Sequence, residues 1–263
     1  MVKPLIMLIP PLGHDPSFYH PLVELISNQY TVLLPEYPYE SNIANVKPEL
    51  ILETLANYFI EYLECFLSKH SDIKFIALGG VSLGATLSIR MNHLMRNKPN
   101  KLLLISPGGL RVSNARKSMI RWAMDNNSIE TFLCQSLAID GDTFEQSSFG
   151  RQFHKLSPNV EKYWNQYARE SWDFGKKRMK ADKFLQMINA ALEVDYEKHI
   201  KSDSDNYVFI WGKSDKIFSI RMYKKFMALA NDATFHLLDD IGHYSPLEDP
   251  KRIANLIHQN IKY

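Results

Sequence analysis

One short segment constrains the fold of this chain more than any other. Lys74–Leu78 is an apolar run that predicts a strand, and Gly79-Gly80 is expected to end it. The sequence Gly80-Val81-Ser82-Leu83-Gly84 follows, and Leu83–Met95 has the apolar spacing of a helix. A Gly-x-Ser-x-Gly segment between a strand and a helix places the serine on a tight, strained turn. Glycine is expected on both sides because a Cβ would collide where the two chain segments pass.

The rest of the chain alternates in the same way between short apolar runs and amphipathic stretches. The order predicts an α/β fold with a mostly parallel central sheet and helices on both faces. The predicted strands are Leu5–Ile9, Thr31–Leu34, Lys101–Ile105, Tyr207–Trp211 and Thr234–Leu238. The predicted helices are Tyr19–Ser27, Pro48–Lys69, Ser219–Asn231 and Asp249–Lys262.

The alternation stops between residues 110 and 202. This stretch is helical in character, rich in aromatic residues, and too long for a plain loop inside one domain. We therefore predict a core domain of residues 1–109 and 203–263, with a helical insertion at 110–202. Two basic clusters lie in the insertion: Arg111, Arg116, Lys117 and Arg121, and then Lys176, Lys177, Arg178, Lys180 and Lys183. Such clusters are usually solvated helix faces, and the sharper interpretation is a docking surface for an acidic partner.

Composition and termini limit the function classes. The formal net charge of +2 provides no strong field for nucleic acid. No run approaches the roughly 18 apolar residues of a membrane helix, so no membrane span and a cytoplasmic protein are expected. The apolar run Pro4–Pro11 is better explained by a first core strand than by a signal peptide. Cys65 and Cys134 match no metal or redox spacing and are predicted to be free thiols packed in helices.

Two later loops contain groups that could activate Ser82. Asp215 follows the predicted strand Tyr207–Trp211, and His243 follows the last predicted strand. Asp239 and Asp240 also follow that last strand and compete with Asp215 for the same role. A serine hydroxyl is a weak nucleophile, so it needs an imidazole to take its proton and a carboxylate to orient that imidazole. The carboxyl ends of parallel strands share one sheet edge, where such groups can meet.

These segments together resemble the α/β-hydrolase superfamily over nearly the whole chain, most of all its capped esterases, lipases and thioesterases. That family has the order nucleophile, acid, base, which implies Ser82, Asp215 and His243. Its frequent Trp-Gly-x-x-Asp segment matches Trp211–Asp215, although a later proline of the family is absent here. The resemblance implies an α/β-hydrolase fold with the insertion as a helical cap, or lid, after the sixth strand. It implies no cofactor and no metal.

The resemblance also implies two backbone donors for an oxyanion. One is the N–H of Leu83, directly after the nucleophile, and the other is the N–H of Leu12 in the loop after the first strand. The family often has His-Gly before this second position, whereas this chain has Pro10-Pro11. Proline has no N–H, so Pro11 cannot donate, but Leu12 can. The two prolines either stiffen the loop or displace it.

The function that this resemblance implies is a serine hydrolase, of the carboxylesterase type, that cleaves an ester or thioester through an acyl-enzyme. The substrate would be a small-molecule ester or a carrier-linked acyl ester, such as the pimeloyl-carrier methyl ester of biotin biosynthesis, with the acidic carrier docking on the basic cap. Two alternatives stay open. One is a carbon–carbon bond hydrolase or lyase on the same fold, and the other is a slow or non-catalytic ligand-binding protein. Epoxide hydrolases and haloalkane dehalogenases are disfavoured, because they need aspartate where this chain has Ser82.

Overall fold

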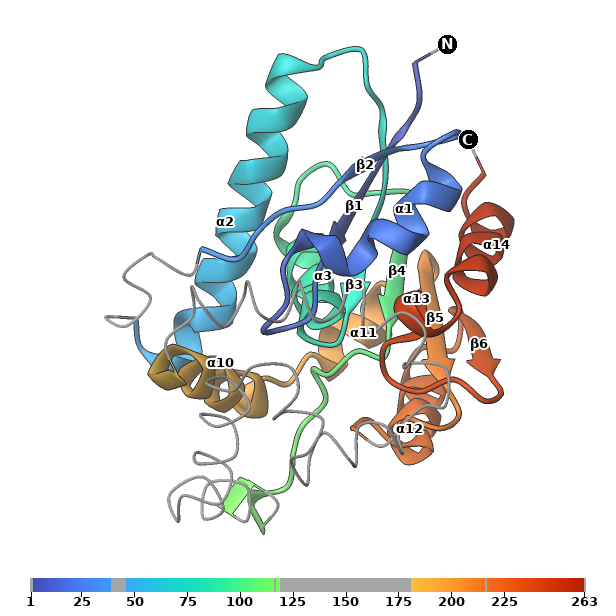
Figure 1. The fold of residues 1–263 in the computed structure, drawn as a ribbon. Coiled ribbons are helices and arrows are strands. Elements are labelled where there is room, and N and C mark those ends of the chain that lie inside the picture. The colour runs from blue at the N-terminus through green and yellow to red at the C-terminus, as the bar shows by residue number, and fades with distance from the viewer. Residues whose placement is uncertain (1, 39–45, 116, 119–180, 216, 263) are drawn as a thin grey trace.

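The computed structural model describes residues 2–38, 46–115, 117–118, 181–215 and 217–262. Within these residues, six parallel strands form one sheet in the order β2-β1-β3-β4-β5-β6 (Figure 1). The predicted α/β fold with a parallel central sheet is confirmed. The strands are β1 (Leu5–Ile9), β2 (Thr31–Leu33), β3 (Phe75–Val81), β4 (Lys101–Ile105), β5 (Tyr207–Gly212) and β6 (Thr234–Leu238).

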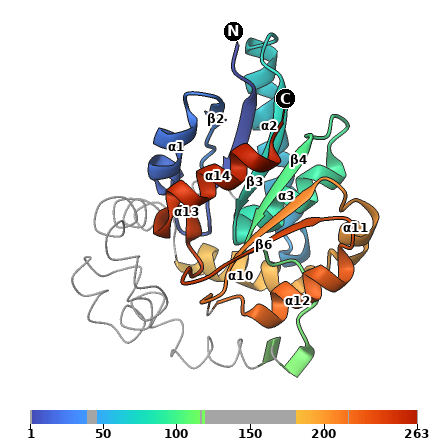
Figure 2. The ribbon, with the colours of Figure 1, turned by 90° about the vertical axis from the view of Figure 1, so that its right-hand side faces the viewer.

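Helices cover both faces of the sheet. On one face α1 and α14 pack side by side, with α13 and the 3-10 helix η1 next to them (Figures 1 and 2). On the other face lie α2, α3, α11 and α12, and α10 packs against α2. The bounds are η1 (Pro16–Tyr19), α1 (His20–Ile26), α2 (Pro48–Lys69), α3 (Leu83–Leu94), α10 (Ala181–Glu193), α11 (Glu197–Ser202), α12 (Ile220–Leu229), α13 (Ser245–Glu248) and α14 (Pro250–Asn260).

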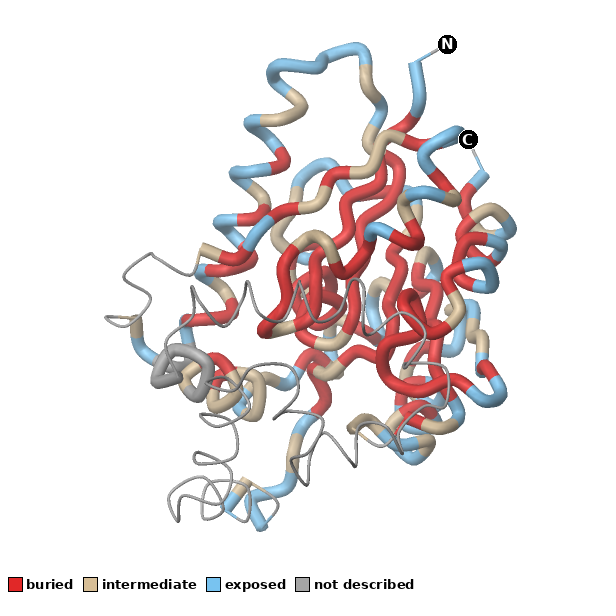
Figure 3. Tube along the Cα trace, in the orientation of Figure 1, coloured by how far each residue is buried: buried red, intermediate tan, exposed pale blue. Residues whose placement is uncertain are grey.

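The core lies on both faces of the sheet because the strands are apolar on both faces. In β1, Leu5, Met7 and Ile9 pack into the core on the α2 side, whereas Ile6 and Leu8 pack into the core on the α1 side. This alternation is the period of two of a β-strand. Figure 3 shows the buried residues concentrated along the strands. The near-continuous apolar runs of the sequence are explained by this burial on both faces.

One strand is longer than the sequence predicted. Gly79 and Gly80 were expected to end the third strand, but β3 continues through both glycines to Val81. The reason is close packing against the neighbouring strand. A Cβ on Gly79 would lie 2.5 Å from the carbonyl oxygen of Leu103 and 2.7 Å from its Cβ. Glycine therefore serves here to bring β3 against β4 and not to turn the chain.

The predicted insertion lies in the chain between two neighbouring strands, since β4 pairs directly with β5. It follows the fourth described strand of this chain, not the sixth, because only β1 to β4 precede it among residues 2–38 and 46–109. One of its described helices, α10, packs on α2, with Met187 and Ala190 buried in the core. Residues 119–180 lie outside the described residues. They include most of the aromatic residues of the predicted insertion, Arg121, and the second basic cluster up to Lys180. Arg116 also lies outside the described residues.

Two smaller predictions concern the cysteines and the membrane. Cys65 lies on α2 and is a free thiol, but it is exposed, so the prediction that it is packed is wrong. It falls on the outer side of the amphipathic helix, whose Leu63 faces the core. Cys134 lies outside the described residues. In the part of the chain that the structure describes, no helix has the length and hydrophobicity needed to cross a membrane.

Candidate active site

The turn between β3 and α3 holds Ser82 in a strained conformation. Its φ of 56° and ψ of −116° are unusual for any residue except glycine. Such strain costs on the order of 1–3 kcal/mol and persists only where the surroundings enforce it. A Cβ on Gly80 would lie 2.6 Å from the carbonyl carbon of Gly84 and from the oxygen of Ile9. A Cβ on Gly84 would collide with the same oxygen. The predicted need for glycine on both sides is confirmed.

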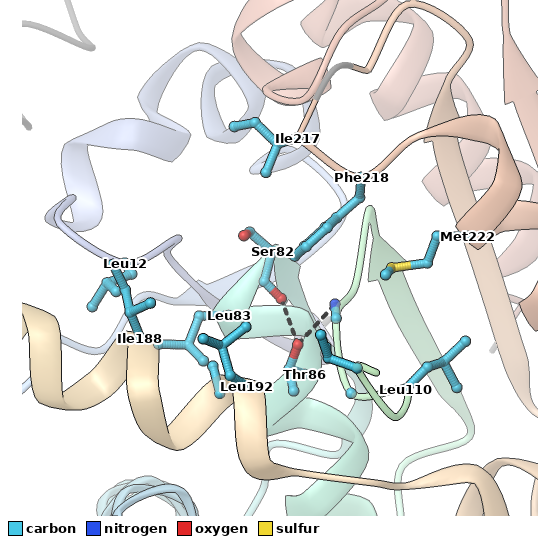
Figure 4. Close-up of a pocket in the computed structure, with 14 residues that line it drawn as sticks. Leu12, Ser82, Leu83, Thr86, Leu110, Ile188, Leu192, Ile217, Phe218 and Met222 are labelled. Carbon is cyan, nitrogen blue, oxygen red and sulfur yellow. Dashed lines mark hydrogen bonds between the residues drawn. The ribbon is translucent and has the colours of Figure 1, made fainter. Parts of the chain in front are cut away.

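Thr86 fastens this turn to the loop after β4. Its hydroxyl donates to the carbonyl oxygen of Ser82 at 3.0 Å and accepts from the N–H of Gly108 at 2.9 Å (Figure 4). The side chain also lines the cavity beside Ser82. Sequence reasoning missed this residue. The available signal was a threonine four residues after the serine on a helix, where a hydroxyl can reach back to a carbonyl.

The amino end of α3 points at the same place. The first helical hydrogen bond runs from the N–H of Thr86 to the carbonyl of Ser82 at 3.0 Å. The N–H groups of Leu83, Gly84 and Ala85 therefore have no carbonyl partner inside the helix. Together with the helix dipole they favour negative charge next to Ser82. Leu83, the first predicted oxyanion donor, lines the cavity with Ser82.

The loop that contains Leu12 is held by two buried tyrosines. Tyr19 donates its hydroxyl to the carbonyl of Ile9, and Tyr37 donates to the carbonyl of Pro10, each at 2.9 Å. Gly13, with a φ of 83°, then turns the chain. Leu12 lines the same cavity as Ser82 and Leu83 (Figure 4). The two prolines thus leave Leu12 beside the turn, and the tyrosines explain how a loop with missing N–H groups is fixed.

Asp215 and His243 form a buried pair at the ends of β5 and β6. The Nδ1 of His243 lies 2.8 Å from Oδ2 of Asp215, and both residues are 3% exposed. The other oxygen, Oδ1, accepts the N–H groups of Ile217 at 2.9 Å and Phe218 at 2.8 Å. Both carboxylate oxygens are therefore in use, and the carboxylate is fixed in direction. The competitor Asp239 is exposed and pairs with Lys213 at 3.0 Å.

Backbone contacts hold the acid loop and the base loop together. Ser214 donates its N–H to the carbonyl of Ile241 at 2.9 Å. A Cβ on Gly212 would collide with the carbonyl oxygens of Ile241 and Gly242, so glycine is required at the end of β5. The indole N–H of Trp211 closes the acid loop by donating to the carbonyl of Phe218 at 2.7 Å.

Glu248 holds the loop that contains His243 by hydrogen bonds to its backbone. This buried carboxylate accepts the N–H of Gly242 at 2.5 Å and the N–H of Tyr244 at 3.0 Å, the residues on either side of His243. Sequence reasoning missed it. The available signal was an acidic residue five positions after the histidine, but only the tight turn into α13 brings its side chain back to those amides.

His14 is a second histidine close to the pair. It is fully buried, and its ring meets those of Phe18 and Tyr244 with centroids 5.2 Å apart. Burial, and secondarily the charge of His243, lowers the pKa of His14 from 6.5 to about 3. His14 is therefore neutral at any ordinary pH and adds no positive charge beside His243.

The cavity above Ser82 has a volume of about 250 Å³. Its walls are apolar apart from Ser82 and Thr86, and they come from the Leu12 loop, from α3, from the loop after β4, from α10 and from the acid loop (Figure 4). Phe218 joins the two halves of the site, since it lines the cavity and its ring meets that of His243 edge-on at 5.3 Å. Within the described residues, no group of three or more His, Cys, Asp or Glu side chains could hold a metal ion.

The features of this site are those of an α/β hydrolase. The sheet is parallel, the serine lies on a strained strand-to-helix turn, and a carboxylate–imidazole pair is buried at the same sheet edge. The model of the alpha/beta hydrolase family matches residues 6–256. The chain therefore belongs to the alpha/beta hydrolase family. No curated protein matches it.

Solved structures share the fold at low identity. MenH from S. aureus is similar with a TM-score of 0.70 and 16% identity, over 99% of this chain and 94% of that chain. The enol-lactonase from Burkholderia xenovorans LB400 has a TM-score of 0.68 and 13% identity, over 99% and 92% of the two chains. A thermophilic esterase from Thermogutta terrifontis has a TM-score of 0.66 and 15% identity, over 98% and 89%. At these identities the likeness shows the fold alone.

Proposed function

We propose that the protein is a serine hydrolase that cleaves a carboxylic ester or thioester through an acyl-enzyme. The observation that carries the proposal is the place of Ser82, which lies on a strained turn and lines an apolar cavity with Leu12 and Leu83. A serine that only capped a helix would need neither the strained backbone nor the cavity. The buried pair of Asp215 and His243 supplies the acid and base that such a nucleophile requires.

In the proposed reaction the hydroxyl oxygen of Ser82 attacks the substrate carbonyl carbon, and Nε2 of His243 accepts the hydroxyl proton. The oxyanion accepts the N–H groups of Leu83 and Leu12. The bond to the alcohol or thiol then breaks, and the leaving group takes the proton from His243. Water attacks the acyl-enzyme with the same base and releases the acid and free Ser82. Asp215 keeps the Nδ1 proton on its own side and stabilises the imidazolium.

The cavity suggests the size of the bound group. Its volume of about 250 Å³ is below the usual range of roughly 300–1,000 Å³ for drug-sized ligands, so it suits a short or medium acyl chain. Ile188 and Leu192 on α10 form one wall, and we assign residues 110–202 as the cap that shields the acyl-enzyme. A carrier-linked acyl methyl ester stays within this substrate class.

The test is covalent labelling combined with ester hydrolysis. A fluorophosphonate probe should label Ser82, and 4-nitrophenyl esters of increasing acyl length should be hydrolysed. Ser82→Ala and His243→Ala should each lower kcat on the order of 10³-fold or more. Ser106→Ala is the matched control, because Ser106 is also buried with a positive φ of 44° at the end of the neighbouring strand. Labelling that survives in Ser82→Ala, or no labelling and no turnover in the folded protein, contradicts the proposal.

A further inference from the structure

A second cavity continues from the one that contains Ser82. It has a volume of about 510 Å³ and shares Leu110, Val112 and Met222 with the first. In Figure 4 Leu110 and Met222 lie on the same side of Ser82, away from Leu12. The way from the serine into the second cavity therefore passes between the loop after β4 and the start of α12.

The two cavities differ in chemistry. The first is lined almost wholly by apolar side chains, whereas the second also contains the charged residues Arg111, Lys225 and Glu197. Arg111 directly follows Leu110 in the chain, and Lys225 comes one helical turn after Met222 on α12. Each shared apolar residue thus has a cationic neighbour that faces the second cavity. A ligand that followed this path would pass from an apolar region to a basic one.

Within the part of the chain that the structure describes, the two cations are open to a ligand. Neither Arg111 nor Lys225 forms an ion pair with any residue in the described part of the chain. Glu197 is the one acidic residue that lines the cavity within the described residues, so the charge there is positive by one. A guanidinium and an ammonium group that line one cavity are the usual recognition elements for a carboxylate or phosphate.

We propose that this second cavity is a subsite for an anionic group at the far end of the substrate's acyl chain. This rests on the proposed ester hydrolysis at Ser82 and names its substrate class: esters of an acid whose apolar chain ends in a carboxylate or a phosphate. The apolar part occupies the first cavity, and Arg111 and Lys225 bind the terminal charge. Glu197 disfavours a cationic end and so adds selectivity.

The experiment compares matched esters with the full-length protein. One series is 4-nitrophenyl monoesters of dicarboxylic acids of increasing length, and the partner series carries a methyl ester in place of the free carboxylate. At the length that spans both cavities, the charged ester should have the higher kcat/KM. In the Arg111→Glu, Lys225→Glu double variant this preference should fall on the order of tenfold, with little change for the neutral ester. An ester that ends in a phosphate, run alongside, decides between the two anions.

Lys224→Glu is the matched control, because Lys224 is an exposed lysine next to Lys225 that does not line the cavity. It should keep the preference for the charged ester. Equal kcat/KM values for charged and neutral esters at every length overturn the subsite. So does an equal loss on both series in the double variant. Absence of turnover for the neutral esters as well would instead contradict the proposed hydrolase function, so the two failures are distinguishable.

Discussion

The buried histidine beside the candidate site makes the stability of the protein depend on pH in a calculable way. The pKa of His14 is about 3 in the folded protein against an ordinary value of 6.5. Between these values the unfolded chain holds one proton more than the folded chain, so the free energy of unfolding falls as the pH falls. The slope from this one group is about 1.4 kcal/mol per pH unit. The stabilisation is complete above 6.5 and is lost as the pH drops through the window.

From about pH 7 to about pH 5 this amounts to about 2 kcal/mol. The amount depends little on the folded pKa of His14, because about 3 lies well below this pH range. Two kcal/mol is a large part of the usual stability of a domain. The assay is urea unfolding at a series of pH values, for the wild-type protein and for His14→Gln.

The variant removes the titration, so its curve of unfolding free energy against pH should be flatter than that of the wild type by about 2 kcal/mol over this range. A general loss of stability from the substitution shifts the whole curve and does not change that difference. His20→Gln, which removes an exposed histidine six residues later, is the control for the replacement of a histidine by glutamine. Parallel curves for the wild type and His14→Gln would refute the reasoning.

Three further substitutions test the groups that hold the site. Glu248→Gln replaces a carboxylate oxygen by an amide group that faces an N–H donor. The free energy of unfolding in urea should therefore fall by about 2 kcal/mol, and the kcat for esters should fall too. An unchanged unfolding midpoint and kcat would refute this. Gly84→Ala should lower the stability measured by thermal unfolding by roughly 3 kcal/mol or more, because the new Cβ meets two backbone carbonyl oxygens. Gly108→Ala should lower it less, because its Cβ meets only the Thr86 hydroxyl, at 3.1 Å. The reverse order would contradict the packing argument. Tyr37→Phe leaves the carbonyl of Pro10 without its donor and should cost about 1–3 kcal/mol, whereas the exposed Tyr62→Phe should be neutral; equal melting temperatures would count against the tyrosine clamp.

Much of the fold could be predicted from the sequence because the patterns that indicate strands and helices are local. A strand buried on two faces is a short apolar run, as in Leu5–Ile9, and a helix on a sheet has apolar residues at a spacing of three and four, as in Pro48–Lys69. The bounds of those two elements agree with the structure. The end of β3 could not be predicted, because the need for glycine at position 79 comes from a contact with Leu103, on a strand more than twenty residues later. A contact that is distant in the chain gives no local pattern.

The candidate site divides in the same way. Ser82, Asp215 and His243 could be found because each follows a predicted strand within a recognisable local pattern. The residues that hold them could not, since their roles depend on where a loop returns. Tyr37 reaches the carbonyl of Pro10 across 27 positions. Thr86 and Glu248 are near in sequence to the residues they hold, but a threonine on a helix or a glutamate after a turn is too common to single out.

This division has a physical cause that bears on how such a site tolerates change. A reacting group must be exposed to the cavity, so it lies on a turn, and turns are held by few contacts of their own. Here each turn is held by a buried side chain: Thr86 on α3 for Ser82, Tyr37 for the Leu12 loop and Glu248 for His243. The strain at Ser82 can persist because these buried groups and the packed glycines leave the backbone no relaxed alternative. A substitution of Thr86, Tyr37 or Glu248 should therefore lower stability and turnover together, whereas Ser82→Ala should lower turnover with little effect on folding.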